Sequence, residues 1–329
     1  MLQNESLKSF DYVRGGTQKD KYTATEVTYW PCPLCGSEEE MHIKTERDVL
    51  RIVQCRSCDL VRINPRLEHP EEVYTGNVDI YREEFRMILN GRAPHHRDWN
   101  YLRDVALVKS LKPTGNWLDV GANVGSFLRH ARGQGWKLLG VEPSEKMASL
   151  AREWWGLEIV TSFLEKADLP ERHFDIITLT DVFEHVVNPQ EMLAAAHRLL
   201  KPDGILFLKV PNGKFNWLKF KVRTALGRPS GNDYDAYEHV CHYTHDTLAK
   251  MLEKSGFKPD RIFVETHVQI PMWHKFTGHY YQHETPWILD WKTRTGRTLC
   301  YHAAKVESLF GLGKVGYLAP NIGCIARLR

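Results

Sequence analysis

The sequence has no long apolar run and no large excess of either charge. Nothing in its 329 residues approaches the roughly 18–20 consecutive apolar residues that span a bilayer. The 44 Lys and Arg nearly balance 41 Asp and Glu, a formal net charge of +3, too even for a dedicated nucleic-acid binder. The first residues lack the apolar segment of a secretory signal, so none is expected. With 42% hydrophobic residues the chain can bury a substantial core, which excludes wholesale disorder.

Cysteine is scarce and unevenly distributed. The seven cysteines are an odd number, in a chain long enough to fold without disulfides. Cys241, Cys300 and Cys324 are scattered and are interpreted as buried thiols. The other four form two tight pairs: Cys32, Cys35, Cys55 and Cys58. This usage predicts a reducing, cytoplasmic setting.

The spacing of the paired cysteines, C-x2-C-x19-C-x2-C, predicts a structural zinc site. Each C-x2-C turn directs two sulfurs at one point, and two such turns complete a tetrahedron. Two redox motifs, or chance, are the alternatives. A redox pair is expected to open a helix, whereas Pro31, Pro33 and Gly36 indicate turns. No open ligand position is apparent, so a catalytic zinc is not expected.

The chain divides into four predicted regions. Residues 1–27 are polar and are interpreted as a flexible tail, and residues 28–69 hold the cysteines and form a zinc-ribbon module. Residues 70–112 are charged and aromatic and are predicted to be a helical linker. The remainder, residues 113–329, is predicted to be one α/β domain.

Strands and helices alternate in that last region. Strands are predicted at 116–120, 137–141, 157–160, 174–180, 205–210, 261–265 and 322–328. Helices are predicted at 124–132, 145–155 and 244–255, and a further helix is predicted to begin at Pro189. This order favours an open sheet with right-handed crossovers. Two insertions, 211–243 and 267–320, are too long for simple connections and are expected to form lids or substrate elements.

The first predicted strand leads into the segment LDVGANVG, a glycine-rich turn that lets a ligand approach backbone N–H groups. The spacing between Gly121 and Gly125 departs from the dinucleotide fingerprint, but Asn123 tolerates the left-handed conformation that a middle glycine would supply. Asp119 would repel phosphates and suits a ligand with an ammonium or hydroxyl groups. Glu142 ends the second strand, where a carboxylate can bind both hydroxyls of a ribose.

Four segments in order, LDVGANVGSFL, GVEPSEKM, FDIITLTDVFEHV and LKPDGILFLKVPN, resemble the motifs of class I S-adenosylmethionine-dependent methyltransferases. The resemblance covers about residues 115–266 and the final strand. It implies S-adenosylmethionine as cofactor and a seven-stranded Rossmann-like sheet whose last strand is antiparallel. The cofactor contacts that it implies are Asp119, Gly121, Asn123, Gly125, Glu142, Ser162, Phe163, Thr180 and Asp181. Many relatives carry an acidic residue near Ser162, and this chain departs from them there.

The cysteine region adds a second resemblance. CPLCG followed by CRSCDLVRINPR is similar to the N-terminal knuckles of one methyltransferase branch, in which a glycine usually follows the last cysteine instead of Asp59. That branch includes enzymes that methylate sugars and other natural-product intermediates, among them C-methyltransferases of nucleotide-linked keto-sugars. It therefore implies a small-molecule or carbohydrate-like acceptor.

Methylation of a hydroxyl or a carbon acid requires loss of a proton, and three positions compete as the base: His185, Glu238 with His239, and a set of aromatic and histidine residues in the second insertion. His185 follows the fourth strand in DVFEHV; its alternative is a structural role in that loop. Glu238 and His239 precede the 244–255 helix, and the Tyr-Glu-His run resembles the Glu-His motif of sugar C-methyltransferases. The alternative interpretation is a structural role, in which these residues cap or anchor a lid. Neighbouring tyrosines are expected to orient a polar ring: Tyr234, Tyr237 and Tyr243.

Two further segments bear on the acceptor. Residues of the second insertion are predicted to line the substrate site and stack on a ring, in preference to acting as the base: Trp273, His274, His279, Tyr280 and Tyr281. The stretch 214–228 has lysines and arginines but no acid, with apolar residues near one helical face. Such a stretch is typical of a helix on an anionic membrane surface, of a phosphate grip, or of a lid with a solvated outer face. An anionic acceptor, nucleotide- or lipid-linked, would unite these features.

The sequence thus favours a methyltransferase of small or carbohydrate-like intermediates, with O-, N- and C-methylation as alternatives. An RNA methyltransferase with the zinc ribbon as RNA grip is less favoured, because residues 28–66 carry equal numbers of basic and acidic side chains. The remaining hypothesis is an inactive methyltransferase-like assembly factor. The intact Asp119, Gly121, Gly125 and Glu142 argue against it.

Overall fold

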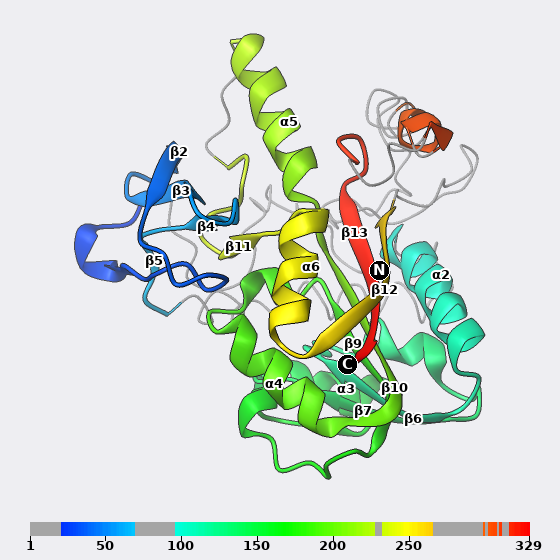
Figure 1. The fold of residues 1–329 in the computed structure, drawn as a ribbon. Coiled ribbons are helices and arrows are strands. Elements are labelled where there is room, and N and C mark those ends of the chain that lie inside the picture. Colours follow the sequence, from blue (N-terminus) through cyan, green and yellow to red (C-terminus); the bar gives the residue numbers. More distant parts are fainter. Residues whose placement is uncertain are drawn as a thin grey trace, which may run out of the picture.

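The computed structural model describes residues 21–69, 96–227, 232–265, 299, 302–307, 309–310 and 316–329. Two sheets organise these residues (Figure 1): one of seven strands and one of four, with a separate two-stranded ribbon beside the smaller sheet. The seven-stranded sheet is called the main sheet below. Residues 28–69 are called the cysteine module.

The main sheet has the strand order β12-β13-β10-β9-β6-β7-β8. Its strands are β6 (Gly115–Val120), β7 (Trp136–Val141), β8 (Ile159–Val160), β9 (Phe174–Thr180), β10 (Leu200–Pro211), β12 (Phe257–Glu265) and β13 (Asn321–Leu328). Strand β13 runs antiparallel to both β10 and β12, whereas β6, β7, β8, β9 and β10 are parallel to one another. The predicted seven-stranded α/β sheet with an antiparallel last strand is confirmed.

Helices cover both faces of the main sheet. They are α2 (His96–Leu111), α3 (Glu145–Trp155), α4 (Pro189–Leu199) and α6 (His245–Lys254), whereas α5 (Gly213–Ala225) covers neither face. Helices α4 and α6 bury Leu193 and Leu252 in the largest apolar cluster, on one face. Helix α2 places Val105 and Val108 against Trp117 on the other face. Each apolar stripe follows the 3–4-residue spacing that makes a helix amphipathic.

One predicted helix is wrong. Residues 124–132 do not form an α-helix; they contain a single 3-10 turn, Leu128–Ala131. Gly125 has a φ of +75°, a left-handed conformation that cannot belong to a right-handed helix. The chain therefore leaves β6 through an extended glycine turn, and only four residues remain for helical structure before the next turn.

The cysteine module is built on the smaller sheet, whose order is β11-β4-β3-β2. Strands β2 (Glu40–Glu46), β3 (Leu50–Cys55) and β4 (Val61–Ile63) belong to the module, but β11 (Cys241–His242) comes from the 211–243 insertion. Cys241 pairs with Arg62, and His242 with Val61. Two distant parts of the chain thus share one sheet.

The ordered structure around the module begins earlier than predicted. Within the expected flexible tail, residues 21–27 include the 3-10 turn Ala24–Glu26 and the start of β1 (Val27–Thr28), which pairs with β5 (Arg66–Leu67). Tyr22 is buried in the apolar cluster of the module. This segment is ordered because the Tyr22 ring packs in the module and its strand pairs with residues 38 and 40 positions later in the sequence.

The cysteine module packs directly on α4 and α6. Cys32, Leu34 and Leu60 belong to the same apolar cluster as the buried side chains of these helices. Gln190 of α4 donates to the Pro33 carbonyl at 2.6 Å, and Lys254 of α6 donates to the Leu34 carbonyl at 2.7 Å. The module and the main sheet therefore share a continuous core.

Helix α5 occupies part of the first predicted insertion and projects away from the body of the protein (Figure 1). Most of the second insertion, with Trp273, His274, His279, Tyr280 and Tyr281, lies outside the described residues. Within the described ranges, no helix combines the length and the hydropathy needed to cross a membrane.

Candidate functional site

The glycine-rich turn after β6 has the conformation that the sequence predicted. Gly121, Asn123 and Gly125 have φ values of +69°, +50° and +75°. A Cβ on Gly121 would lie 2.5 Å from a methyl carbon of Val182, and one on Gly125 would lie 2.5 Å from a methyl carbon of Leu157. Glycine is required at both positions, and asparagine supplies the left-handed residue between them.

Two buried carboxylates border this turn. Glu142 accepts main-chain hydrogen bonds from Asn123 at 2.9 Å and from Ser144 at 2.8 Å, one on each oxygen. Asp119 accepts from the Thr178 hydroxyl at 2.6 Å. The N–H bonds hold the Glu142 carboxylate in one orientation and leave lone pairs on both oxygens for the two hydroxyls of a ribose.

The electrostatics of this pair favour a cationic ligand. Burial and the nearby Glu142 charge raise the pKa of Asp119 to about 7, against the lowering by the Thr178 hydrogen bond. Burial also raises the pKa of Glu142, against the lowering by the Ser144 and Asn123 N–H groups. A ligand with an ammonium or sulfonium group would stabilise the ionised carboxylates.

The other expected cofactor residues lie at the same edge of the main sheet. Ser162 donates its N–H to the Glu142 carbonyl at 3.2 Å, next to Phe163, whose side chain is exposed. Thr180 ends β9, and Asp181 follows it with a φ of +55° and donates its N–H to the Lys209 carbonyl at 3.0 Å. All follow the carboxyl ends of parallel strands, where open α/β sheets bind ligands.

The two competing histidines lie side by side. His185 belongs to the 3-10 turn Phe183–His185, and the centres of the His185 and His239 rings are 4.7 Å apart. The His185 Nδ1 is 2.9 Å from the Glu238 carbonyl oxygen. A carbonyl only accepts, so Nδ1 carries a proton, and in the neutral ring Nε2 is the nitrogen with the lone pair. Nε2 lies 3.6 Å from a carboxylate oxygen of Glu184, a buried acid that the sequence did not single out as a site residue.

The structure also changes what the neighbouring residues can do. The Glu238 side chain accepts from the Tyr237 hydroxyl at 3.1 Å, while its contact with the His185 Nδ1 is through the main chain. Tyr234, Tyr237 and Tyr243 are buried in apolar clusters, not arranged on an open surface as expected for orienting a substrate. Their rings are unavailable to a substrate because they pack into these clusters.

His242 is a third histidine near the pair, with its ring centre 6.1 Å from that of His239. Burial, together with the charges of Lys219 and His185, lowers the pKa of His242 to about 3. Its imidazole therefore stays neutral near physiological pH and cannot act there as a base that gains and keeps a proton.

The four paired cysteines converge, as their spacing predicted. The sulfurs of Cys32 and Cys58 are 3.5 Å apart, as are those of Cys35 and Cys55, and all four lie within 4.8 Å of one another. Burial raises the pKa of Cys55, but N–H groups of Ser57 and Cys58 lower it more, together with neighbouring thiols, to about 7. These N–H groups stabilise the thiolate form that metals bind.

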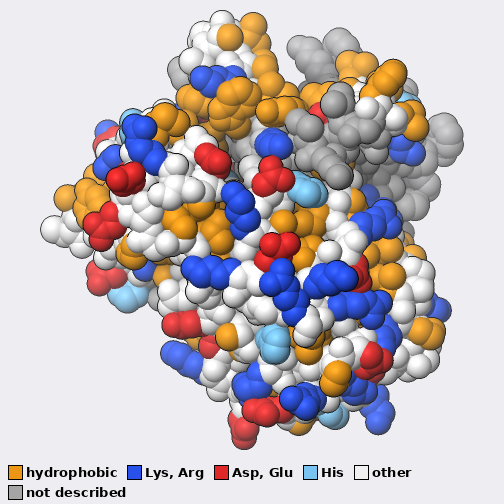
Figure 2. Space-filling view, in the orientation of Figure 1, with side chains coloured by type: hydrophobic (Ala, Val, Ile, Leu, Met, Phe, Trp, Pro, Cys, Tyr) orange, Lys and Arg blue, Asp and Glu red, His pale blue; other side chains and the backbone are white. Residues whose placement is uncertain are grey.

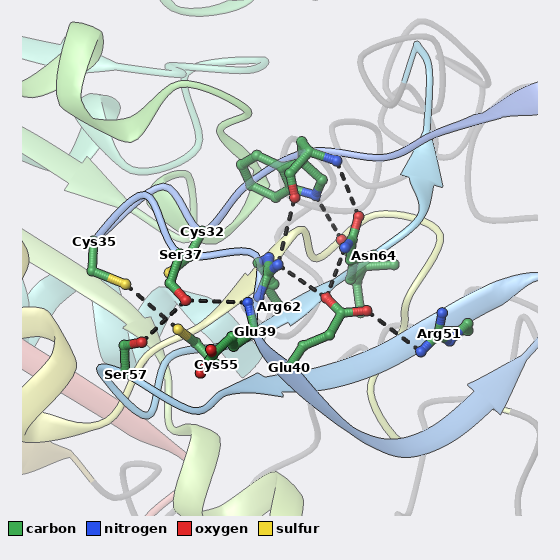
Figure 3. Close-up of polar contacts among 12 residues, drawn as sticks. Cys32, Cys35, Ser37, Glu39, Glu40, Arg51, Cys55, Ser57, Arg62 and Asn64 are labelled. Carbon is green, nitrogen blue, oxygen red and sulfur yellow. Dashed lines mark hydrogen bonds and ion pairs between the residues drawn. The ribbon is translucent and has the colours of Figure 1, made fainter.

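A polar cluster lies beside the cysteine turns (Figure 3). Glu40 accepts from Arg62 at 3.0 Å and from Asn64 at 2.7 Å, and it also pairs with Arg51 at 3.4 Å. Asn64 in turn accepts from the Trp30 N–H at 3.1 Å. The cluster ties β2 to β4 and to the segment that leads into Cys32.

The fold and the carboxylate-lined turn define a class of proteins, the S-adenosylmethionine-dependent methyltransferases. A family model described as a methyltransferase domain matches residues 95–262, about half of the chain, and the chain belongs to this family. The expectations of an enzyme and of S-adenosylmethionine as its cofactor are confirmed at this level.

Individual relatives are distant. The chain is 31% identical over 107 residues to the ubiquinone/menaquinone biosynthesis C-methyltransferase UbiE of Shewanella pealeana, covering 29% of this chain and 43% of that enzyme. It is 25% identical over 186 residues to the enzyme of the same name from Shewanella oneidensis, covering 50% and 73%. A SAM-dependent methyltransferase structure from Archaeoglobus fulgidus is 18% identical, covers 70% of this chain and 94% of its own, and has a TM-score of 0.46.

We predict that Asp119→Ala and Glu142→Ala each weaken S-adenosylmethionine binding by about 1–3 kcal/mol, because each removes a charged hydrogen-bond acceptor. Isothermal titration calorimetry measures the effect. Exposed Glu145→Ala, on a carboxylate that binds Arg152, is the control and should keep the wild-type affinity. Wild-type affinity in both site variants would refute this cofactor site.

The same site predicts a pH dependence. Asp119, with a pKa of about 7, is mostly protonated at pH 6 and ionised at pH 8, so affinity for the cationic cofactor should rise across this range. In Asp119→Ala the rise should disappear. An equal rise in both proteins would assign it to another group.

Proposed function

We propose that this methyltransferase acts on a small-molecule or carbohydrate-like acceptor whose proton is removed by the His185–His239 pair. The observation that carries the proposal is the contact between the two histidines, 4.7 Å between ring centres, after β9 and before α6. The His185–Glu238 hydrogen bond places a proton of His185 on Nδ1, so that in the neutral ring Nε2 is the nitrogen that would accept the acceptor's proton.

The proposed reaction is an in-line displacement at the methyl carbon. The acceptor oxygen or carbon forms the new bond to the methyl group, and the bond from methyl to sulfur breaks with its electron pair left on sulfur. The acceptor proton goes to an imidazole nitrogen of the pair. Glu184, with a carboxylate oxygen 3.6 Å from His185 Nε2, would stabilise the imidazolium that forms.

A carbon acceptor is the form of the proposal that we favour. Both Shewanella relatives are named as C-methyltransferases of ubiquinone/menaquinone biosynthesis. Forming a carbanion or enolate demands a base more than methylating a neutral amine does, which fits a site with two histidines. The RNA-methyltransferase hypothesis gains little, because Arg51 and Arg62 of the module are engaged with Glu40.

We propose that the cysteine tetrad binds one structural zinc ion. Four thiol sulfurs within 4.8 Å of one another match the donor set and spacing of a tetrahedral site made of four thiolates. Bound zinc would cross-link the two cysteine turns, and no step of the reaction passes through it. Four cysteines that bind zinc as thiolates must stay reduced, which supports a cytoplasmic location.

We propose further that the exposed side of α5, together with Leu226 just beyond its end, makes peripheral contact with an anionic membrane, from which a lipid-linked acceptor would come. Trp217, Val222 and Leu226 are exposed, and the Lys221 Nζ lies 5.6 Å from the centre of the Trp217 ring. Figure 2 shows apolar side chains on the projecting part of the protein. Arg223 is engaged with Asp233, so it adds less charge to this surface than the sequence suggested.

We predict that His239→Ala lowers turnover by about 10²–10⁴-fold, the usual contribution of a general base, with cofactor affinity nearly unchanged. The assay incubates the enzyme with methyl-labelled S-adenosylmethionine and a panel of keto-sugar nucleotides and ring compounds, and identifies the product by mass spectrometry. His185→Ala is the parallel variant, and His245→Ala, outside the pair at the start of α6, is the control.

The two variants discriminate between the histidines. If His185→Ala abolishes turnover while His239→Ala stays within about threefold of wild type, far short of a base deletion, His185 is the base and our emphasis on His239 is wrong. If neither variant lowers turnover, the acceptor needs no base and the proposed acceptor class is wrong as well.

For the tetrad we predict about one zinc per chain under reducing conditions, measured by elemental analysis. Cys32→Ser or Cys55→Ser should lower the zinc content and destabilise the cysteine module, because metal binding supplies folding free energy to so small a unit. Cys324→Ser, on β13 and far from the tetrad in sequence, is the control. A metal-free wild-type protein would refute the site.

For α5 we predict co-sedimentation with vesicles rich in phosphatidylglycerol and little with pure phosphatidylcholine, weakening as salt rises. Trp217→Glu should lower the bound fraction, because it removes an exposed ring and adds a repelled charge. Exposed Tyr29→Glu, on the cysteine module, is the matched control. Equal binding of all three proteins would exclude this contact.

A further inference from the structure

A carboxylate of the cysteine module binds the main chain that leads to His239. Glu46 ends β2, and its side chain is fully buried. One of its oxygens accepts from the N–H groups of Asp233 at 2.7 Å and Tyr234 at 3.0 Å, and the other accepts from the N–H of Ala236 at 3.1 Å. Three charge-assisted hydrogen bonds hold one turn, and each is stronger than a bond between neutral groups.

The charges around this contact balance. Lys44 lies 2.7 Å from an oxygen of Asp233 and 3.4 Å from one of Glu46, and Arg223 of α5 lies 2.9 Å from the other oxygen of Asp233. Two buried carboxylates thus face two cations. This pairing offsets much of the cost of removing the carboxylates from water, so the cluster can remain ionised inside the protein.

The turn held by Glu46 continues directly into His239. Asp235 has a φ of +51°, a strained conformation for a residue other than glycine. Its carbonyl accepts from the N–H groups of both Glu238 and His239 at 3.0 Å. The strain at Asp235 is tolerated because the bonds to Glu46 on either side fix the turn.

The other end of the segment is held as well. The Val240 N–H donates to the Glu184 carbonyl at 2.8 Å, and the Val240 carbonyl accepts from the Ile63 N–H of the module at 3.0 Å. The Glu238 carbonyl that accepts the His185 hydrogen bond therefore lies between two fixed points of the main chain, the 233–236 turn and Val240. Both points are hydrogen-bonded to the cysteine module.

We propose that Glu46 is a positioning residue: by fixing the 233–236 turn, it places His239 and the Glu238 carbonyl, and through that carbonyl it sets the tautomer of His185. The inference rests on the proposed function of this histidine pair. It makes the cysteine module part of the acceptor side of the enzyme, with no contact between Glu46 and the substrate required.

The test reads the histidines directly and needs no acceptor. Full-length protein with histidine labelled by nitrogen-15 is studied by NMR in the presence of S-adenosylmethionine, and His185→Ala and His239→Ala spectra assign the two rings. Wild-type His185 should show the Nδ1–H tautomer. In Glu46→Ala, the His185 signals should move to the mixture dominated by Nε2–H that free imidazole side chains show. Cofactor affinity should stay within about twofold of wild type and the metal content should not change, because Glu46 contacts neither the cofactor site nor the cysteine tetrad.

The matched control is Glu40→Gln, at the opposite end of β2, where the carboxylate binds Arg62 and Asn64. It should keep the wild-type His185 tautomer. Glu46→Gln is the conservative variant: its amide oxygen can still accept from Asp233 and Tyr234, while its NH2 group opposes the Ala236 N–H, so an intermediate tautomer ratio is expected. It also serves as the test variant if Glu46→Ala fails to fold.

Two results would overturn the proposal. One is a wild-type His185 tautomer in the folded Glu46 variant. The other is the same tautomer change in Glu40→Gln, which would make it a general loosening of the module. A changed tautomer in the Glu46 variants together with full turnover of His239→Ala and His185→Ala would support the positioning role and refute the proposed base, so the two ideas fail separately.

Discussion

The joining of β11 to β4 is the constraint on which the arrangement of this protein depends. Cys241 and His242 complete the sheet of the cysteine module, although about 180 residues separate them from their partners. The strand pairing fixes the end of the segment that carries His239, and the shared apolar cluster fixes the module on α4 and α6. A structural change in the cysteine module is therefore expected to move the segment that precedes α6.

Buried charges in the described structure fall into two kinds. Lys209 is buried, yet the charges of Asp104 and Glu265 outweigh its desolvation and raise its pKa, so this cluster is self-contained and ties α2 to β10 and β12. Asp119 and Glu142 are buried as well, but they are held by a hydroxyl and by main-chain N–H groups. Neutralised clusters stabilise the fold, whereas the two carboxylates are suited to a positively charged ligand.

The proposed acceptor side is assembled from three separate parts of the chain. Glu184 and His185 follow β9, Glu238 and His239 precede α6, and Glu46 comes from the cysteine module. Main-chain groups make most of the connections among them, including the Glu238 carbonyl and the Val240 N–H. Main-chain contacts hold position well because the backbone has fewer soft torsions than a long side chain.

The sequence by itself determined the main sheet, the glycine turn and the grouping of the cysteines. These features are local. Strands such as Phe174–Thr180 are mostly apolar runs of sequence, and a left-handed Asn123 or a C-x2-C turn depends on neighbouring residues. The same reasoning placed a helix at 124–132, where the backbone of Gly125 excludes it.

Only the tertiary structure decided which distant residues meet. No pattern connects Glu46 with Asp233, or Val61 with His242, because these contacts depend on how the module packs and not on local spacing. For the same reason the sequence ranked His185 and His239 as rivals, whereas the fold brings their rings together, and it assigned Tyr234 to the substrate, whereas packing buries it. Local hydrogen bonding and periodicity are encoded residue by residue, but burial and long-range contact follow from the whole chain folding at once.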